Sequence, residues 1–443
     1  MTNPAQSAVD STAFTELRAG SIAMARLWRA LVFPAKLFWG LIFCQSLVGS
    51  LLVIGWTYRL AQRSVLKYWW SRGTSSRGAG SHDFKDFLLA SEDTKPHVDW
   101  PNWFCRQNFL EAVRRPPGVG KGRHILSLFK ALVDSLFLNF WAGLLGAFNT
   151  WVLTLPPCLF WWFGWYDGWN NSFNKGYEQA AVGPLVSLIG IFGFIAVMFF
   201  LPLAQARQAV TGEWRSFYRF RLLWEIARRR WLSCVGLAVL YFLLAVPLTV
   251  LKTGPMFWLQ GHPELATATD ALLIKRLNGY FFWCGLAVLP GFVALRLVGA
   301  RIYSSGILSL VQTGKVQPSM LAQSERDILQ RLDLLTVRVQ PERHFLVKFI
   351  AWTGTRLGRT VGAVALALIW FGFVAQIYIA EFLNHHGALG WLNQTLVQLP
   401  WFHYLPARLK NPIEEVFVGL FAVLLALLIR RVVRGFQATS NKS

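Results

Sequence analysis

Long apolar stretches without charge divide this chain, and each has the length that a membrane span needs. A helix rises about 1.5 Å per residue, so about 20 apolar residues cross the hydrocarbon layer of a bilayer. Seven stretches of about 17 residues or more carry Asp, Glu, Lys or Arg only at their edges: 37–58, 136–166, 184–204, 231–251, 277–300, 361–382 and 413–429. The pattern predicts an all-α, polytopic integral membrane protein with six to seven transmembrane helices plus interfacial amphipathic helices.

The second stretch is longer than one span needs, and Pro156-Pro157 falls within it. Proline removes a helix hydrogen bond and clashes with the preceding turn. We therefore expect Leu136–Leu155 to be the span. Cys158–Trp169 would then lie in the outer interface, with Trp161, Trp165 and Trp169 in an aromatic belt.

Basic residues are distributed unevenly between the apolar stretches. The segments 59–135, 205–230 and 301–360 carry 13, 7 and 9 Lys or Arg, and the C-terminal tail carries 4. The alternate connections, 167–183, 252–276 and 383–412, carry 1, 3 and 2. Because cytoplasmic loops collect positive charge, the first group is predicted to be cytoplasmic, together with the C-terminus. The formal net charge of +22 is then better explained by anionic membrane lipids than by nucleic acid.

The first apolar stretch does not fit this alternation. The N-terminal segment carries Arg18, Arg26, Arg29 and Lys36, and one crossing would place these residues outside. Either the chain has seven spans, or the stretch 37–58 re-enters or lies in the interface. Its glycines and Ser50 would permit a bend, and we favour six spans with a non-crossing first stretch.

These patterns divide the chain into seven parts. They are a basic amphipathic N-terminal segment (1–36), a hydrophobic helix that is transmembrane or re-entrant (37–58), a basic cytoplasmic loop with a Ser/Gly linker (59–135), a bundle of four transmembrane helices (136–300), a basic cytoplasmic loop with an amphipathic helix (301–360), a C-terminal pair of transmembrane helices (361–429) and a cytoplasmic tail (430–443). Within 318–339, Leu321, Ile328, Leu332 and Leu335 share one helical face, which is too narrow for an independent core. We expect this segment to dock on the membrane part.

A basic amphipathic helix is predicted for Trp214–Trp231. Trp214, Phe217, Trp224 and Trp231 can share an apolar stripe, so the helix can lie in the inner interface with its arginines on lipid phosphates. The arginines expected to contact headgroups are Arg215, Arg219, Arg228, Arg229 and Arg230. The alternative is that these residues only enforce the topology.

Three glycines at intervals of four, Gly354, Gly358 and Gly362, form a small-residue face at the start of the sixth stretch. Such a face lets helices approach closely. It predicts intramolecular helix packing or, alternatively, an oligomer interface.

The sequence shows no signal for catalysis. It lacks GxSxG, HExxH and Walker A patterns. His385, His386 and His403 share a predicted loop with Glu381, but without a ligand spacing. Arg296 and Glu381 lie near the ends of their stretches, so no ionisable group is expected deep in the bundle, which weakens a transport function. We expect no catalytic residue, no metal and no cofactor.

Three functions stay open at this stage. The first is a non-catalytic protein of a bacterial plasma membrane that organises anionic lipids, a protein partner or copies of itself through its basic cytoplasmic face. The second is a transporter or channel, and the third is a membrane-embedded enzyme. The sequence favours the first.

Overall fold

The computed structural model describes residues 33–73, 83–90, 121–166, 182–262, 268–337, 345–384 and 387–400. Within these ranges the chain is helical and contains no β-strand, so the all-α class is confirmed for them. Residues 1–32 of the N-terminal segment, the predicted span 413–429 and the tail lie outside the described residues.

The described residues form α-helices and two short 3₁₀-helices. In chain order they are α2 (Leu47–Trp70), α3 (Phe84–Leu89), α5 (Lys121–Gly164), α7 (Val182–Met198), α8 (Leu201–Thr211), the 3₁₀-helix η5 (Trp214–Tyr218), α9 (Phe220–Arg229), α10 (Trp231–Gly261), α11 (Asp270–Gln312), the 3₁₀-helix η7 (Pro318–Met320), α12 (Gln323–Arg331), α13 (Phe345–Asn384) and α14 (Gly387–Leu392).

Several of these helices could cross a membrane. The four that are long and apolar enough are Ile125–Gly164, Trp231–Trp258, Asp270–Gln312 and Thr353–Leu383. α7 and α8 pass the same test together, and they make a fifth span if the pair counts as one despite its bend of 43°. Apolar helices of this length are typical of a membrane protein. The expected six to seven spans are not confirmed, since the described residues supply four or five.

The first apolar stretch is divided. A short apolar helix occupies Phe33–Phe43, and α2 begins after Ser46, whose Oγ accepts a hydrogen bond from the Gly49 N–H (3.1 Å). This cap satisfies a donor that the first turn of a helix leaves free. The bend brings Gly49 against the backbone of Phe43, and a Cβ on Gly49 would be 2.0 Å from the Phe43 carbonyl oxygen. Neither piece is among the candidate spans of the described chain.

The prediction that Pro156-Pro157 ends a helix is wrong. α5 continues through both residues to Gly164. Proline is tolerated in membrane helices where neighbouring helices compensate for it. Here α7 packs against the prolines, since a Cβ on Gly190 would be 2.8 Å from the Pro157 carbonyl oxygen. Residues 158–164 therefore extend the helix instead of forming a separate interfacial segment.

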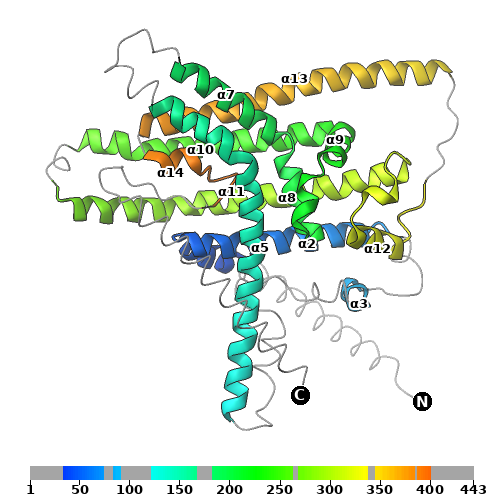
Figure 1. The fold of residues 1–443 in the computed structure, drawn as a ribbon, viewed down its shortest axis with the longest axis horizontal. Coiled ribbons are helices and arrows are strands. Elements are labelled where there is room, and N and C mark those ends of the chain that lie inside the picture. Colours follow the sequence, from blue (N-terminus) through cyan, green and yellow to red (C-terminus); the bar gives the residue numbers. More distant parts are fainter. Residues whose placement is uncertain are drawn as a thin grey trace, which may run out of the picture.

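Figure 1 shows α2, α10, α11 and α13 running in one shared direction, with α5 running across them. The backbones of α2 and α5 nearly touch at their crossing. A Cβ on Gly55 would be 1.7 Å from the Asn139 carbonyl oxygen, and one on Gly143 would be 1.8 Å from that of Leu51. Because any side chain would separate the helices, the crossing requires glycine in both.

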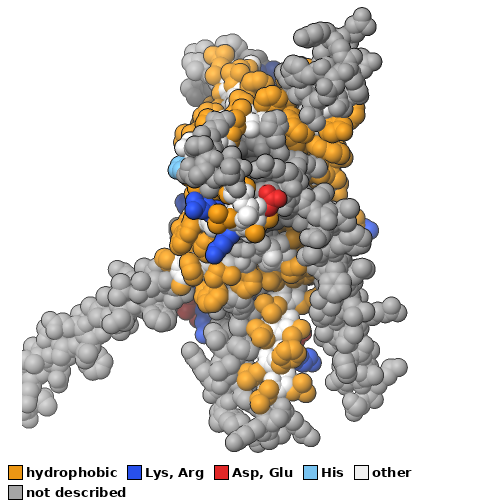
Figure 2. Space-filling model, turned by 90° about the vertical axis from the view of Figure 1, so that its left-hand side faces the viewer, with side chains coloured by type: hydrophobic (Ala, Val, Ile, Leu, Met, Phe, Trp, Pro, Cys, Tyr) orange, Lys and Arg blue, Asp and Glu red, His pale blue; other side chains and the backbone are white. Residues whose placement is uncertain are grey.

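Basic helix ends gather on one side of the molecule. The C-terminal ends of α2 and α11, the N-terminal ends of α10 and α13, and α9 and α12 all lie on the right in Figure 1. Lys67 of α2, Arg229 of α9 and Lys315, just after α11, belong to these ends. Figure 2 views the opposite side, where hydrophobic side chains cover most of the described surface and few are basic. Basic segments that are far apart in the sequence thus meet in space.

Candidate functional site

Charged side chains lie inside the described core, which the sequence did not predict. Lys252 of α10 donates a hydrogen bond through Nζ to Glu381 Oε1 of α13, and these side chains are 1% and 0% exposed. Taking two charges out of water is costly, and a close partner offsets part of that cost. The expectation that the bundle holds no deep ionisable group is therefore wrong. It failed because α10 continues to Gly261, which places Lys252 within the helix instead of in a connection.

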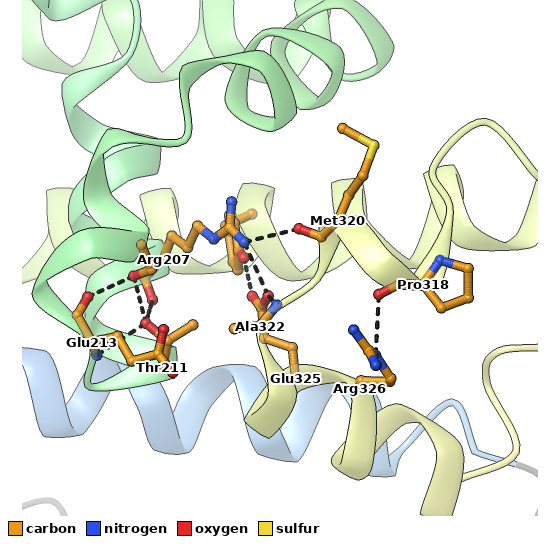
Figure 3. A network of polar contacts seen from close by, with 10 residues as sticks. Arg207, Thr211, Glu213, Pro318, Met320, Ala322, Glu325 and Arg326 are labelled. Carbon is orange, nitrogen blue, oxygen red and sulfur yellow. Dashed lines mark hydrogen bonds and ion pairs between the residues drawn. The ribbon is translucent and has the colours of Figure 1, made fainter.

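A second buried ion pair joins α8 to α12 (Figure 3). Arg207 is 0% exposed, and its Nη2 lies 3.5 Å from Glu325 Oε2 and 3.3 Å from the Met320 carbonyl oxygen. Glu325 also accepts hydrogen bonds from the Tyr303 hydroxyl of α11 and from the Ala322 N–H (2.9 Å). One carboxylate thus connects three helices.

The position of Glu325 follows from local helix chemistry. It is the third residue of α12, where a glutamate side chain reaches back to the N–H before the helix and where negative charge favours the helix dipole. Leu321, Ile328 and Leu332 are buried beneath it, and Leu335 is partly buried. α12 therefore docks on the membrane helices, as its narrow apolar face predicts.

Irregular backbone over Asn393–Pro400 is buried among the helices. The Val397 carbonyl oxygen accepts hydrogen bonds from Arg296 Nη2 of α11 (2.8 Å) and from Gln205 Nε2 of α8 (3.2 Å). Gln398 Nε2 donates to Thr154 Oγ1 of α5 (2.6 Å). Three helices thus bind this segment through polar side chains.

The segment also satisfies its own backbone. The Gln394 N–H donates to Gln398 Oε1 (2.6 Å), and the Leu399 N–H donates to Asn393 Oδ1 (3.1 Å). Non-helical backbone at membrane depth is tolerated only where protein or a water-filled cavity surrounds it. The sequence assigned these residues to an outer connection. The signal that could have revealed them was the run NQTLVQLP, which mixes amides and leucines without any charge.

The two outer tryptophans that the structure describes are buried in the protein. Trp161 is 0% exposed and Trp165 is 8% exposed, so the belt prediction is wrong for both. Trp161 stacks on Phe194 of α7 with ring centroids 4.7 Å apart, and Trp165 lies 5.9 Å from Trp391 of α14. α7 and α14, which come from other parts of the chain, cover these rings. Trp169 lies outside the described residues.

The basic amphipathic segment consists of two helices, η5 and α9, which meet at Arg219. Phe217 is buried against the protein, whereas Trp214 and Trp224 are 48% and 47% exposed. The buried side of α9 is formed by Leu222, Leu223 and Ile226. α9 therefore packs on the protein through these three residues, and contact of the exposed tryptophans with the inner interface stays a prediction.

The five arginines predicted to contact headgroups lie at or near the surface. Arg215, Arg219, Arg228 and Arg229 are exposed or half-buried, and Arg230 is half-buried. The Arg215 guanidinium lies 5.4 Å from the Trp214 ring centroid.

Two of these arginines attach α9 to α11. Arg229 Nε donates to Ser309 Oγ (2.9 Å), and Arg230 Nη2 donates to the Ser305 carbonyl oxygen (3.1 Å). The structure thus fixes the orientation of α9, while headgroup contact stays a prediction.

The three glycines of α13 have different surroundings. Gly354 is exposed, and a Cβ on it would have no neighbour within 4 Å, whereas Gly358 and Gly362 face the ring of Trp231. A Cβ on Gly362 would be 2.3 Å from that ring. Packing of another helix backbone on this face stays a prediction.

Metal binding has no candidate cluster in the part of the chain that the structure describes. No group of three or more His, Cys, Asp or Glu that could hold a metal occurs there. His385, His386 and His403 lie outside the described residues.

Comparisons of this chain with protein-family models, with curated proteins and with solved structures find no match.

Proposed function

We propose that this is a non-catalytic, multi-pass protein of a bacterial plasma membrane that organises anionic lipids or partner proteins through a basic cytoplasmic face. One observation supports this function above the others: α9 is held against α11 while arginines of its segment stay exposed. A basic helix in that position suits the headgroup layer of an anionic leaflet.

The proposal includes a topology of six crossings with a cytoplasmic C-terminus. Five crossings would come from α5, the α7–α8 pair, α10, α11 and α13, and the sixth from 413–429. The partners would be anionic headgroups, a second protein or another copy of the chain, with no nucleic acid. Single-cysteine labelling at residues 77 and 440 tests the topology, because both sites should label only from the cytoplasmic side.

Extraction in detergent-free nanodiscs, followed by mass spectrometry, tests the function. We expect anionic phospholipids to be enriched over the bulk membrane, or a protein partner to be retained at a fixed stoichiometry. A matched variant with Arg215→Gln and Arg219→Gln should lose part of the lipid enrichment. The proposal would be contradicted if the wild-type protein retained lipids in the same proportions as the bulk membrane and retained no protein partner.

Transport is the second candidate, and specific observations favour it. A buried ion pair and irregular backbone inside a helical bundle are typical of substrate or ion pathways. Here these features are the Lys252–Glu381 pair and Asn393–Pro400. Proton flux into liposomes with an internal pH-sensitive dye tests this function. Flux by the wild type that Glu381→Gln abolishes would replace the first proposal, and liposomes as tight as empty ones would count against proton movement.

A further inference from the structure

A cleft of about 90 Å³ lies between α9, the turn after α11 and the first part of α13. Its lining combines basic residues from three separate segments with one carboxylate and one apolar residue. The lining residues are Glu225, Arg228, Arg229, Leu310, Lys315 and Arg359. A cavity of about 10–15 Å³ holds one water, so this cleft has room for a small tetrahedral oxyanion.

The charge in the cleft is strongly positive. Glu225 Oε1 lies 3.3 Å from Arg228 Nη1, and this carboxylate neutralises one of four cations. Arg359 Nε is buried and has no hydrogen-bond partner among the described residues. A buried donor without a partner is costly. The cleft is thus electrostatically and chemically suited to an anionic acceptor.

Local structure fixes two of the cations in place. Gly314 has φ of +65°, a left-handed conformation that ends α11 and lets the Lys315 N–H bond the Leu310 carbonyl oxygen (3.1 Å). This turn places Lys315 beside α9. The bond from Arg229 Nε to Ser309 Oγ fixes the second cation.

We infer that this cleft binds one phosphate group, carried by an anionic phospholipid headgroup or present as free phosphate. Guanidinium groups match phosphate oxygens in a planar, bidentate geometry. The inference rests on the proposed function, because it assigns a defined site to the lipid attraction of the basic face. It goes further in naming Lys315 and Arg359, which lie on elements other than the basic amphipathic segment.

The test uses the full chain in phosphatidylcholine nanodiscs that contain a minor fraction of phosphatidylglycerol. Native mass spectrometry measures the Kd of the most tightly retained phosphatidylglycerol. The cleft variant is Lys315→Gln with Arg359→Gln, and the control is Arg215→Gln with Arg221→Gln, which removes the same charge from exposed positions outside the cleft. A basic residue beside the bound phosphate contributes roughly 1 kcal/mol, so the loss of two should raise this Kd about 30-fold. The control removes two charges outside the cleft and should raise it much less.

Glu225→Gln provides a test with the opposite sign. It removes the carboxylate that pairs with Arg228, so binding should become about fivefold tighter. Loss of folding cannot produce tighter binding. Unchanged or weaker binding by this variant would overturn the inference.

A second arm uses inorganic phosphate in nanodiscs of phosphatidylcholine alone. If phosphate stabilises the wild type but not the cleft variant, the cleft accepts free phosphate. That result supports the inference even if the protein has no preference for phosphatidylglycerol. Equal effects of the cleft and control variants in both arms would overturn the inference and leave the proposed function standing. A wild type without any preference for phosphatidylglycerol and without a partner would instead contradict the proposed function.

Discussion

Arginine occurs in two kinds of environment in this protein, and the contrast between them separates structural from accessible charge. Arg207 and Arg296 are 0% and 7% exposed, and each binds backbone or carboxylate oxygens from a distant part of the chain. The exposed arginines around α9 bind neighbours on α9 and α11 or lie over an aromatic ring. The first kind is enclosed by the protein and joins distant segments, whereas the second kind stays accessible to a ligand even where it bonds to a neighbouring helix.

The largest effect is expected at the Lys252–Glu381 pair. Glu381→Gln leaves a buried ammonium without its counter-charge, which should cost about 3–5 kcal/mol. Thermal unfolding in nanodiscs at one heating rate measures the loss. The double variant Lys252→Met, Glu381→Met removes both charges at similar volume and should recover most of the stability. A double variant as unstable as Glu381→Gln would show that the pair does not act as a pair.

A smaller effect is expected at Arg207. Arg207→Gln removes the ion pair that joins α8 to α12, so α12 should loosen. The cost should be only about 2–3 kcal/mol, because Glu325 keeps two other donors after the arginine is lost. Hydrogen exchange over 323–331 measures the loosening. Arg326→Gln serves as the control, since Arg326 Nε donates only to the nearby Pro318 carbonyl oxygen among the contacts in Figure 3. Equal protection in both variants would contradict the role of Arg207.

The crossing of α2 and α5 should be sensitive to one methyl group. Gly55→Ala places a Cβ 1.7 Å from a backbone oxygen, so the helices must separate at a cost of about 1–3 kcal/mol. A Cβ at Gly236 on α10 would have no neighbour within 4 Å, so Gly236→Ala should be neutral or slightly stabilising. Thermal unfolding of both variants compares them directly. A Gly55→Ala protein as stable as Gly236→Ala would contradict the close crossing.

The smallest effect on stability is expected for Arg215→Gln with Arg219→Gln. Both side chains lie at the surface, so the free energy of unfolding should change by less than about 0.5 kcal/mol. Enrichment of anionic lipid should nevertheless fall, because these charges are accessible from outside the helix bundle. A large loss of stability would mean that the surface arginines are structural, like Arg207.

Four of the predicted spans lie in long described helices and a fifth falls on the bent pair α7–α8, because apolar length is a local property that about 20 residues suffice to show. The ends of these helices were harder to predict. Pro156-Pro157 continues a helix because α7 packs on it, and α10 extends past Lys252. Both outcomes depend on neighbours from other parts of the chain.

The candidate sites show the same division. The arginines of the basic segment could be predicted from their charge and spacing, whereas the cleft required Lys315 and Arg359 from two further segments. Lys252 and Glu381 are 129 residues apart, and no periodicity in the sequence relates them.

Composition and the apolar pattern were enough to predict the all-helical class with membrane-length helices, since these arise from properties of short stretches. Burial of particular polar groups depended on packing. Arg207 and residues 393–400 look like loop or topology signals in the sequence, yet each lies inside the described core. A buried charge is stable only where a partner from elsewhere in the chain meets it, and the folded arrangement of the helices supplies that partner.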